Sequence, residues 1–276
     1  MEIAPLGQWS IQEITASFNL AFTDYFVRFD ATPDYLQERW KAAGVDWELS
    51  PAAVADNQLV GFMAMAPDLI ESQKAIFNVG TGVVPSARGK RLVKKMYQWM
   101  FPQLAAQGFT RMGLEVITQN HIAIKAYESV GMRIHRELYC FGGEIDIAGY
   151  QSEGEWRLHA LPNWERYAHL RLYTPPWEFR DAPLKRQADH LFLEKWVGDN
   201  CLSYAAFSSN NNSITQFGFQ DEIAGRELFQ ELAFRLGKLK INNVDTKADI
   251  AISVLQDLAF TNPINQYEMW ADLPVL

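Results

Sequence analysis

Cysteine is scarce in this sequence, with only Cys140 and Cys201 among 276 residues. Two cysteines are too few for a disulfide framework, so we expect a reducing, cytoplasmic setting, with Cys140 as a small packed residue rather than a nucleophile. No Cys and His residues are grouped at the spacing of a zinc site, so no metal is expected. The N-terminal residues show no basic segment before an apolar run, and no window approaches the ~20 apolar residues of a membrane-spanning helix. We therefore expect no membrane partner.

Positive charge is also in short supply. The chain has 25 Lys and Arg against 33 Asp and Glu, a formal net charge of -8 and a pI of about 5.2. A nucleic-acid-binding protein needs a broad basic face, so no nucleic-acid partner is expected. The acidic balance favours a cationic or neutral small substrate. Hydrophobic residues make up 48% of the chain, an ordinary globular content, and 276 residues fit one large domain or two small ones.

One stretch departs from this acidic background. The segment TGVVPSARGKRLVKKMY, residues 81–97, runs from an apolar strand through a turn into a helix. Its five cations fall within eight residues: Arg88, Lys90, Arg91, Lys94 and Lys95. The start of a helix presents free N–H groups and partial positive charge, which bind phosphate readily. The pattern predicts a phosphate or diphosphate at 88–93, and the alternative is a solvated helix start paired with surface carboxylates.

The first half of the chain reads as a mixed α/β unit of about 145 residues. Ser10 and Glu13 have the spacing of a capping box, and Thr32 and Gly44 bracket a second helix. The expected helices are 10–23, 32–44, 88–108 and 120–131, and the expected strands are 50–55, 59–67, 74–85, 111–117 and 133–143, with a turn at 56–58.

The end of the second half repeats the order of the first. Residues 202–273 read as strand, strand, helix, strand, helix, strand. Residues 249–260 match 121–132 at an offset of 128, and Gly225 falls on Gly89 at an offset of 136. We interpret this as an internal duplication, the alternative being that any two amphipathic helices look alike. A polar segment near residue 149 then divides the chain into domains 1–148 and 149–276.

Two motifs in the first half resemble those of the GNAT superfamily of N-acetyltransferases. The family pattern V-x-P-x-x-R-G-x-G-x-G/A stands here from Val83 to Val93. The pattern N-x-x-A-x-x-x-Y-x-x-x-G-F/M follows, filled by Asn120, Ala123, Tyr127, Gly131 and Met132. The resemblance covers residues 1 to about 145. Arg91 and Val93 depart from it, because the family usually has Gly and then Gly or Ala there.

The resemblance implies an α/β fold with a GNAT-like mixed central sheet flanked by helices, duplicated as two tandem domains. It implies transfer of an acetyl group from acetyl-CoA, as co-substrate, to a primary amine by direct attack in a ternary complex. The acceptor would be a small-molecule or peptide amine, and homodimer formation is left open. The implied cofactor-binding residues are Val83, Val84, Arg88, Gly89, Lys90, Arg91, Leu92, Val93, Asn120 and Ala123.

Two catalytic roles follow from the same resemblance. Tyr127 would give a proton or hydrogen bond to the leaving thiolate, with a packed core tyrosine as the alternative. A strand amide at Val83 or a close neighbour would bind the oxyanion. An amine with a pKa near ~10.4 must lose a proton before it attacks, so a general base is needed. Glu115 is one candidate for that base, and Asp68, Glu71 and His121 are the others.

The second copy is predicted to be degenerate. Ala224 stands for Arg88, Ala248 for Asn120, and Leu255 for Tyr127. We expect this half not to bind CoA and to extend the core or wall the acceptor pocket. Four of its tryptophans would either line the acceptor pocket or pack in the core: Trp156, Trp164, Trp177 and Trp196. The alternative function is a non-catalytic acyl-CoA-binding or regulatory protein, which the departures at 91 and 93 favour.

Overall fold

The computed structural model describes residues 1–27, 29–70, 72–187 and 189–273. Its contacts divide the chain into two compact units. Unit 1 comprises Met1–His135 and the C-terminal residues from Glu268 onward, and unit 2 comprises Arg136–Tyr267. This division differs from the predicted 1–148 and 149–276. Composition places a boundary at the polar segment near residue 149, whereas strand pairing assigns most of 133–143 to unit 2 and returns the last strand to unit 1.

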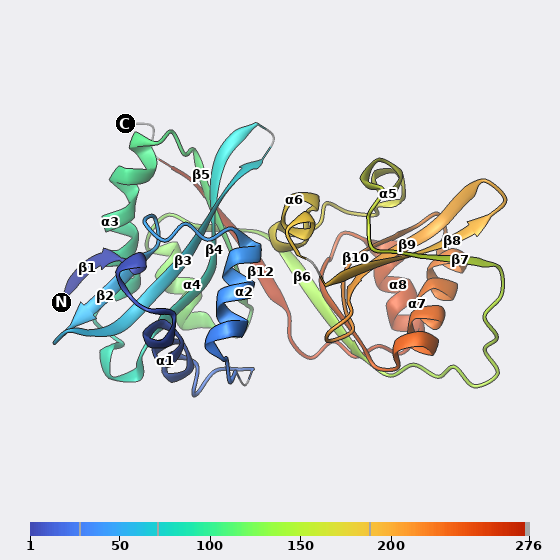
Figure 1. Ribbon diagram of the computed structural model, residues 1–276, viewed down its shortest axis with the longest axis horizontal. Helices are drawn as coiled ribbons and strands as arrows, with labels where there is room; N and C mark the ends of the chain where they lie inside the picture. The colour runs from blue at the N-terminus through green and yellow to red at the C-terminus, as the bar shows by residue number, and fades with distance from the viewer. Residues whose placement is uncertain (28, 71, 188, 274–276) are drawn as a thin grey trace. The chain divides into compact units, whose positions relative to one another are not determined.

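Unit 1 is a mixed sheet with helices on both faces (Figure 1). Its strand order is β1-β2-β3-β4-β5-β12; β1 to β4 pair antiparallel, and β4 pairs parallel with β5. The elements are β1 (Glu2–Pro5), η1 (Leu6–Gln8), α1 (Ile11–Ala21), α2 (Pro33–Ala43), β2 (Pro51–Ala55), β3 (Gln58–Ile70), β4 (Gln73–Val83), η2 (Pro85–Ala87), α3 (Leu92–Ala106), β5 (Arg111–Ile117), α4 (His121–Glu128) and β12 (Gln266–Asp272).

Local residue chemistry sets the element ends in unit 1, as the sequence predicts. Ser10 and Glu13 form the predicted capping box at the start of α1. Thr32 caps α2, and Gly44 ends it in a left-handed conformation at φ 77°. The two residues between β2 and β3 also have positive φ, 50° at Asp56 and 58° at Asn57, as a tight hairpin turn requires.

The two faces of the unit 1 sheet carry different helices. Helices α1 and α2 share a buried core with Phe62 and Ala64 of β3. On the opposite face, Asn78 of β4 donates a hydrogen bond to Tyr97 of α3, and α4 contacts α3. Because side chains alternate along a strand, Phe77 points to the α1–α2 face and Asn78 to the α3–α4 face.

The sheet of unit 1 opens between β4 and β5. The register of β3 on β4 skips Val79, which marks a bulge in β4. The parallel register of β4 on β5 runs only from Ala75 against Arg111 to Asn78 against Leu114. Beyond that point β4 continues to Val83 and β5 to Ile117. The two strands therefore split apart at the bulge, on the side that leads to α3 and α4.

The strands of unit 2 follow the order β6-β11-β10-β9-β8-β7, with both parallel and antiparallel pairs. Its elements are β6 (Arg133–Gly143), β7 (Glu155–His159), α5 (Trp164–Leu170), η3 (Trp177–Phe179), α6 (Asp181–Lys185), β8 (His190–Val197), β9 (Asn200–Ser208), β10 (Ser213–Phe219), α7 (Glu222–Leu236), β11 (Leu239–Asp245) and α8 (Asp249–Asp257). The predicted order over 202–273 is confirmed. The elements from β7 to β8 lie in a stretch that the sequence left unassigned.

The backbone carries the predicted duplication at both offsets. The cap residues Asn120 and Ala248, 128 positions apart, have φ and ψ of -83° and 64° in the first and -85° and 62° in the second. After the helices, Gly131 and Ala259 both have positive φ, 94° and 59°. At the other offset, the bulge at Val79 of β4 recurs at Thr215 of β10, 136 positions later.

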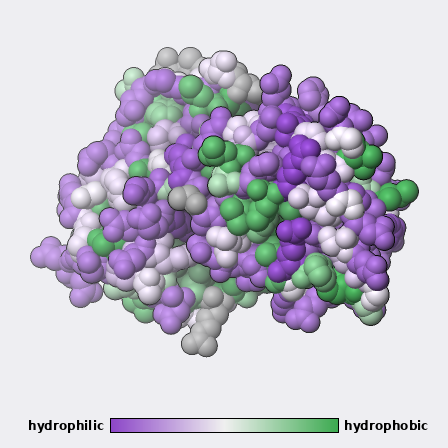
Figure 2. Space-filling model, turned by 45° about the vertical axis from the view of Figure 1, so that its right-hand side comes forward, coloured by the Kyte–Doolittle hydropathy of each residue, from purple (hydrophilic) through white to green (hydrophobic). Residues whose placement is uncertain are grey.

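The surface is predominantly hydrophilic on the face in Figure 2, where hydrophobic side chains form small groups among polar ones. Exposed large hydrophobic residues occur singly on several helices, such as Ile122 on α4 and Ile223 on α7. Among the described residues, no helix combines the length and apolar character needed to cross a bilayer.

Candidate functional site

The segment between β4 and α3 presents a row of open backbone amides. Arg91 is the N-cap of α3 and gives no side-chain cap. The first backbone bond of the helix is donated by Lys95 to the Arg91 carbonyl, at 3.1 Å. Within the described chain, no acceptor meets the amides of residues 89–94. These donors stand at the positive end of a 15-residue helix, which is the arrangement that binds an anion.

Left-handed backbone at two residues turns these amides outward. Gly89 has φ 76°, and Arg91 has φ 57° and ψ 33°. Glycine adopts such angles without cost, whereas an arginine there is strained by about 1 kcal/mol. The departure from the family pattern at Arg91 therefore falls on a residue whose conformation favours glycine. A Cβ at Gly89 would meet nothing within 4 Å, so that glycine serves the backbone angle rather than packing.

The equivalent segment of unit 2 is helical instead. Residues 222–227, equivalent to 86–91, form the first part of α7. The carboxylate of Asp221 caps this helix by accepting from the Ala224 amide at 2.9 Å. Gly225 lies inside the helix, where a Cβ would come within 2.9 Å of the Phe219 ring. A protein carboxylate thus takes the place that an anion would need, which favours the prediction that this half does not bind CoA.

Arg88 points away from the open amides. Its guanidinium donates to both carboxylate oxygens of Asp24, at 2.5 and 2.7 Å, and to the Ala21 carbonyl at 3.0 Å. Its Nε donates to the Val83 carbonyl at 3.2 Å. The guanidinium lowers the pKa of Asp24 through these hydrogen bonds. Arg88 therefore joins the ends of α1 and β4, while Lys90 and Arg91 stay exposed beside the amides.

A polar cluster occupies the α3–α4 face where β4 and β5 split. The Asn78 side-chain nitrogen donates to Thr81 Oγ1 at 2.7 Å and to the Tyr97 hydroxyl at 2.9 Å. The hydroxyl of Tyr127 on α4 is hydrogen-bonded with the Thr81 side chain, and its ring meets Tyr97 edge-on at 6.4 Å. Burial raises the pKa of Tyr127 to about 12. The structure thus brings the predicted acid to the split, close to β4.

The start of α4 joins this cluster through Asn120. Its side-chain oxygen accepts from the Ala123 amide at 3.1 Å, so Asn120 is the helix cap. Its side chain is also hydrogen-bonded with Tyr25, which follows α1. Tyr25 lies in a group of rings with Phe22 and Phe26, at 4.8 and 5.4 Å. Sequence reasoning missed Tyr25, since nothing local marks a residue whose contacts lie 95 positions away.

Glu115 sits on β5, one residue past the last pair with β4. Alternation places its side chain on the face of Gly113, opposite the face of Leu114 and Asn78. Tyr127 and Glu115 thus approach the split from opposite faces. Among the other base candidates, Asp68 lies on β3, paired with Ala75 of β4, and His121 is exposed at the start of α4. Glu71 falls outside the described residues.

The C-terminal strand brings a second carboxylate beside Glu115. The Leu273 amide donates to the Thr110 carbonyl at 2.7 Å, and a Cβ on Gly113 would lie 2.7 Å from the Trp270 ring. These contacts fix an antiparallel register of β12 on β5. Continued by two residues, the register sets Glu268 opposite Glu115 on the same face. Glu268 is 1% exposed. The sequence placed this strand in the second domain and so gave no sign of the pair.

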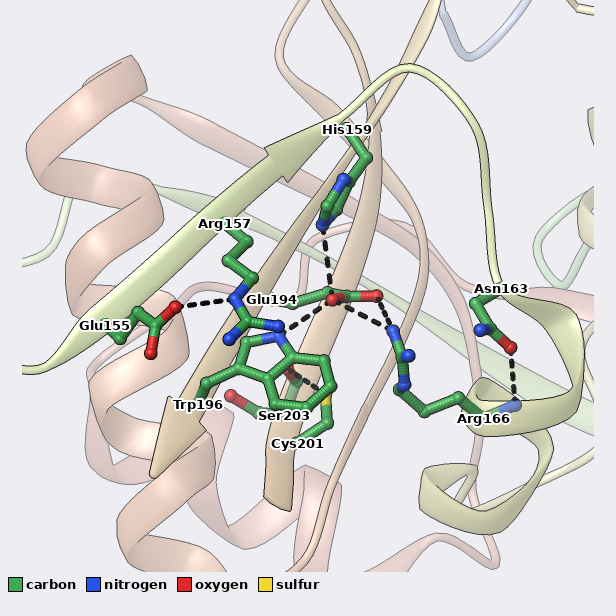
Figure 3. Close-up of polar contacts among 9 residues, drawn as sticks. All are labelled: Glu155, Arg157, His159, Asn163, Arg166, Glu194, Trp196, Cys201 and Ser203. Carbon is green, nitrogen blue, oxygen red and sulfur yellow. Dashed lines mark hydrogen bonds and ion pairs between the residues drawn. The ribbon is translucent and has the colours of Figure 1, made fainter. Parts of the chain in front are cut away.

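A separate polar cluster lies in unit 2 around the buried carboxylate of Glu194 (Figure 3). It accepts from Arg166 at 3.0 Å and from Trp196 Nε1 at 2.8 Å, and His159 lies at 3.3 Å. The guanidinium groups of Arg157 and Arg166 lie 4.0 and 4.5 Å from the Trp196 ring centroid. These contacts join β7, β8 and α5, and they bury Trp196 rather than opening it to a pocket.

Cys140 and Trp177 both pack within unit 2. The thiol of Cys140 is half-buried and donates to the Asn243 side-chain oxygen at 3.2 Å. Trp177 is fully buried. Among the residues that the structure describes, no group of three or more His, Cys, Asp or Glu could hold a metal ion.

The split between β4 and β5 and the open start of α3 lie in the same part of unit 1. Residues 14–132 match the model of the acetyltransferase (GNAT) family. The first part of the chain is therefore a GNAT domain, as its two motifs predicted. Membership of this domain family supports acyl transfer in general. No curated protein sequence matches the chain.

Solved structures extend the likeness to the whole chain. A Pyrococcus horikoshii protein of inferred acetyltransferase activity has a TM-score of 0.73 at 11% identity, covering 99% of this chain and 90% of that one. A GCN5-related N-acetyltransferase from Sphaerobacter thermophilus has a TM-score of 0.69 at 14% identity, covering 100% and 96%. A tandem GNAT protein from the clavulanic acid biosynthesis pathway has 0.67 at 11%, covering 99% and 98%. At these identities the likeness shows the fold, and the predicted tandem GNAT fold is confirmed.

Proposed function

We propose that the protein is an N-acetyltransferase that moves an acetyl group from acetyl-CoA to a primary amine by direct attack in a ternary complex. Unit 1 would carry the reaction. The observation that carries the proposal is the row of open amides at residues 89–94, next to the split between β4 and β5. An acyl-CoA has a diphosphate for such amides and an amide-containing arm that can pair with strand backbone. Its thioester, when bound, supplies the acyl group and a thiolate leaving group.

Different segments of unit 1 would bind different parts of the cofactor. The amides of Gly89 to Val93 would hold the diphosphate, with Lys90 and Arg91 adding charge from exposed positions. The β4 backbone past the bulge, up to Val83 and Val84, would pair with the arm and offer a donor to the oxyanion. Asn120 and Ala123 lie at the start of α4, beside Tyr127. All the residues proposed to bind the cofactor therefore flank one split.

Tyr127 would act as a hydrogen-bond donor to the leaving thiolate. Its pKa of about 12 keeps the phenol protonated at neutral pH. A thiol has an ordinary pKa of ~8.5, so full proton transfer from Tyr127 would be uphill by roughly 3.5 units, or about 5 kcal/mol. A hydrogen bond to a charged sulfur costs no such transfer and stabilises it directly. The buried hydroxyl thus fits the role of donor better than that of free acid.

Glu115 would take the proton from the attacking amine, from the face opposite Tyr127. A base on one face and a donor on the other separates the incoming amine from the outgoing sulfur. The acidic balance of the whole chain favours a cationic acceptor. A polyamine, an aminoglycoside or a lysine side chain is the class of amine to examine first.

The test begins with calorimetry of CoA binding and continues with an acetyl-transfer assay over an amine panel. We expect Lys90→Glu to weaken CoA binding at least tenfold, because it sets a negative charge beside the diphosphate. Arg226 is the equivalent residue of unit 2, so Arg226→Glu is the matched control and should leave binding unchanged. Absence of CoA binding by the unmodified protein would overturn the proposal. Tight binding without transfer to any amine would instead favour the alternative, a non-catalytic acyl-CoA-binding protein.

A further inference from the structure

Two adjacent residues after α1, Asp24 and Tyr25, contact both helix starts that flank the split. Asp24 holds Arg88, which immediately precedes the open amides. Tyr25 is hydrogen-bonded with Asn120, which caps α4. Neither residue belongs to the motifs that identify the family, and both lie in unit 1. We refer to Asp24 and Tyr25 as the clasp.

The contacts of Arg88 leave little freedom at the start of the amide row. Both edges of its planar guanidinium are used: two donors face Asp24, one faces Ala21, and Nε faces Val83. Such a two-oxygen contact fixes orientation as well as distance. Ala21 ends α1, so the cation also meets the negative end of that helix. The backbone that carries Gly89 thus starts from an anchored residue.

We propose that the clasp positions the cofactor-binding segments: Asp24 sets the amide row through Arg88, and Tyr25 sets Asn120. This inference rests on the proposed function, because it concerns the same site. In this role Asp24 acts through Arg88 rather than on the cofactor itself, so it is a positioning residue. Through the clasp, the residues after α1 contact both the segment that starts at Arg88 and the start of α4. A substitution in the clasp should therefore affect the position of both segments.

Two other roles for Asp24 predict different results. If Arg88 leaves Asp24 to bind the diphosphate, the carboxylate competes with the ligand, and its removal should tighten binding. If the ion pair merely supports the fold, its removal should lower stability and leave binding unchanged. Only a positioning role predicts weaker binding from both partners, with no further loss when both are changed.

The experiment measures CoA and ADP binding, together with steady-state kinetics, for Asp24→Asn, Arg88→Ala and the double variant. ADP carries the diphosphate without the arm. We expect each single variant to weaken the binding of both ligands about tenfold. The double variant should bind them no more weakly than Arg88→Ala does. KM for acetyl-CoA should rise by a larger factor than kcat falls. Tyr25→Phe keeps the ring and should weaken CoA about threefold while leaving ADP unchanged.

The control is a similarly exposed ion pair of unit 2, between Arg226 and Asp257. Asp257→Asn should lower stability as Asp24→Asn does and leave both ligands bound as before. Tighter or unchanged CoA binding in Asp24→Asn would overturn the inference while the proposed function stands. Absence of CoA binding in the unmodified protein would overturn the proposed function and, with it, the clasp.

Discussion

Replacing Tyr127 with phenylalanine removes one buried hydroxyl and leaves the ring in place. The hydroxyl is hydrogen-bonded with Thr81, and the ring meets Tyr97 edge-on. The folded protein therefore loses one hydrogen bond, worth about 1 kcal/mol of unfolding free energy. The packing of α4 against α3 is retained, so the variant should fold and its kinetics can be compared directly.

The catalytic effect follows from the pKa of Tyr127, about 12. A phenol this weakly acidic donates a hydrogen bond to the thiolate and keeps its proton. A hydrogen bond to a charged group contributes about 1.5–3 kcal/mol. Its loss predicts a fall in kcat of roughly 10- to 150-fold, with little change in KM for acetyl-CoA.

Steady-state kinetics between pH 6 and 10 checks this reasoning, since Tyr127 should add no basic limb in that range. A fall in kcat beyond roughly 10⁴-fold, or a basic limb near pH 9 that vanishes in Tyr127→Phe, would show that the phenol transfers its proton. Either result would refute the donor role. A spectroscopic titration of the tyrosines adds a check without activity, because Tyr127→Phe should remove a group that ionises near pH 12.

Three further variants probe the rest of the site. Arg91→Gly removes the strain of left-handed backbone but adds chain entropy to the unfolded state, so urea denaturation should give a stability within about 1 kcal/mol of the parent; a larger loss would contradict the strain argument. Glu115→Gln should lower kcat by roughly 10²- to 10⁴-fold at unchanged KM for acetyl-CoA, and activity within threefold of the parent would exclude Glu115 as the base. Asp221→Ala removes the cap on the Ala224 amide and should cost about 1 kcal/mol in thermal unfolding, with CoA affinity unchanged in calorimetry.

The sequence predicts the parts of this fold that depend on near neighbours. The caps at Ser10, Thr32 and Asn120 each involve a bond to a residue three positions away. Gly44 and Gly131 adopt left-handed backbone that few other residues accept. A single sequence contains all of these determinants, so the helix starts and stops fall within a few residues of the prediction.

The features that the sequence could not predict all depend on distant residues. Arg88 looks like a phosphate ligand beside its motif, yet it meets Asp24, 64 positions earlier. Glu268 lies opposite Glu115 only because β12 returns to the sheet of unit 1. The spacing of residues along the sequence does not indicate which distant residues will pair. One signal was present and readable: Arg91 stands where the family has glycine, which marks a left-handed residue.

Unit 2 keeps the core of the fold, while the backbone equivalent to the proposed site differs from that of unit 1. The bulge at Thr215 and the backbone angles of the cap at Ala248 match their counterparts in unit 1. Leu228 and Leu232 of α7 are buried in the core of unit 2. What changes is the segment equivalent to 86–91, which in unit 1 is the end of η2 followed by a turn and in unit 2 is the start of α7. A helix satisfies its own amides after the first turn, and Asp221 takes one of those left over. The proposed anion binding thus depends on a helix that starts late and without a side-chain cap, as α3 does and α7 does not.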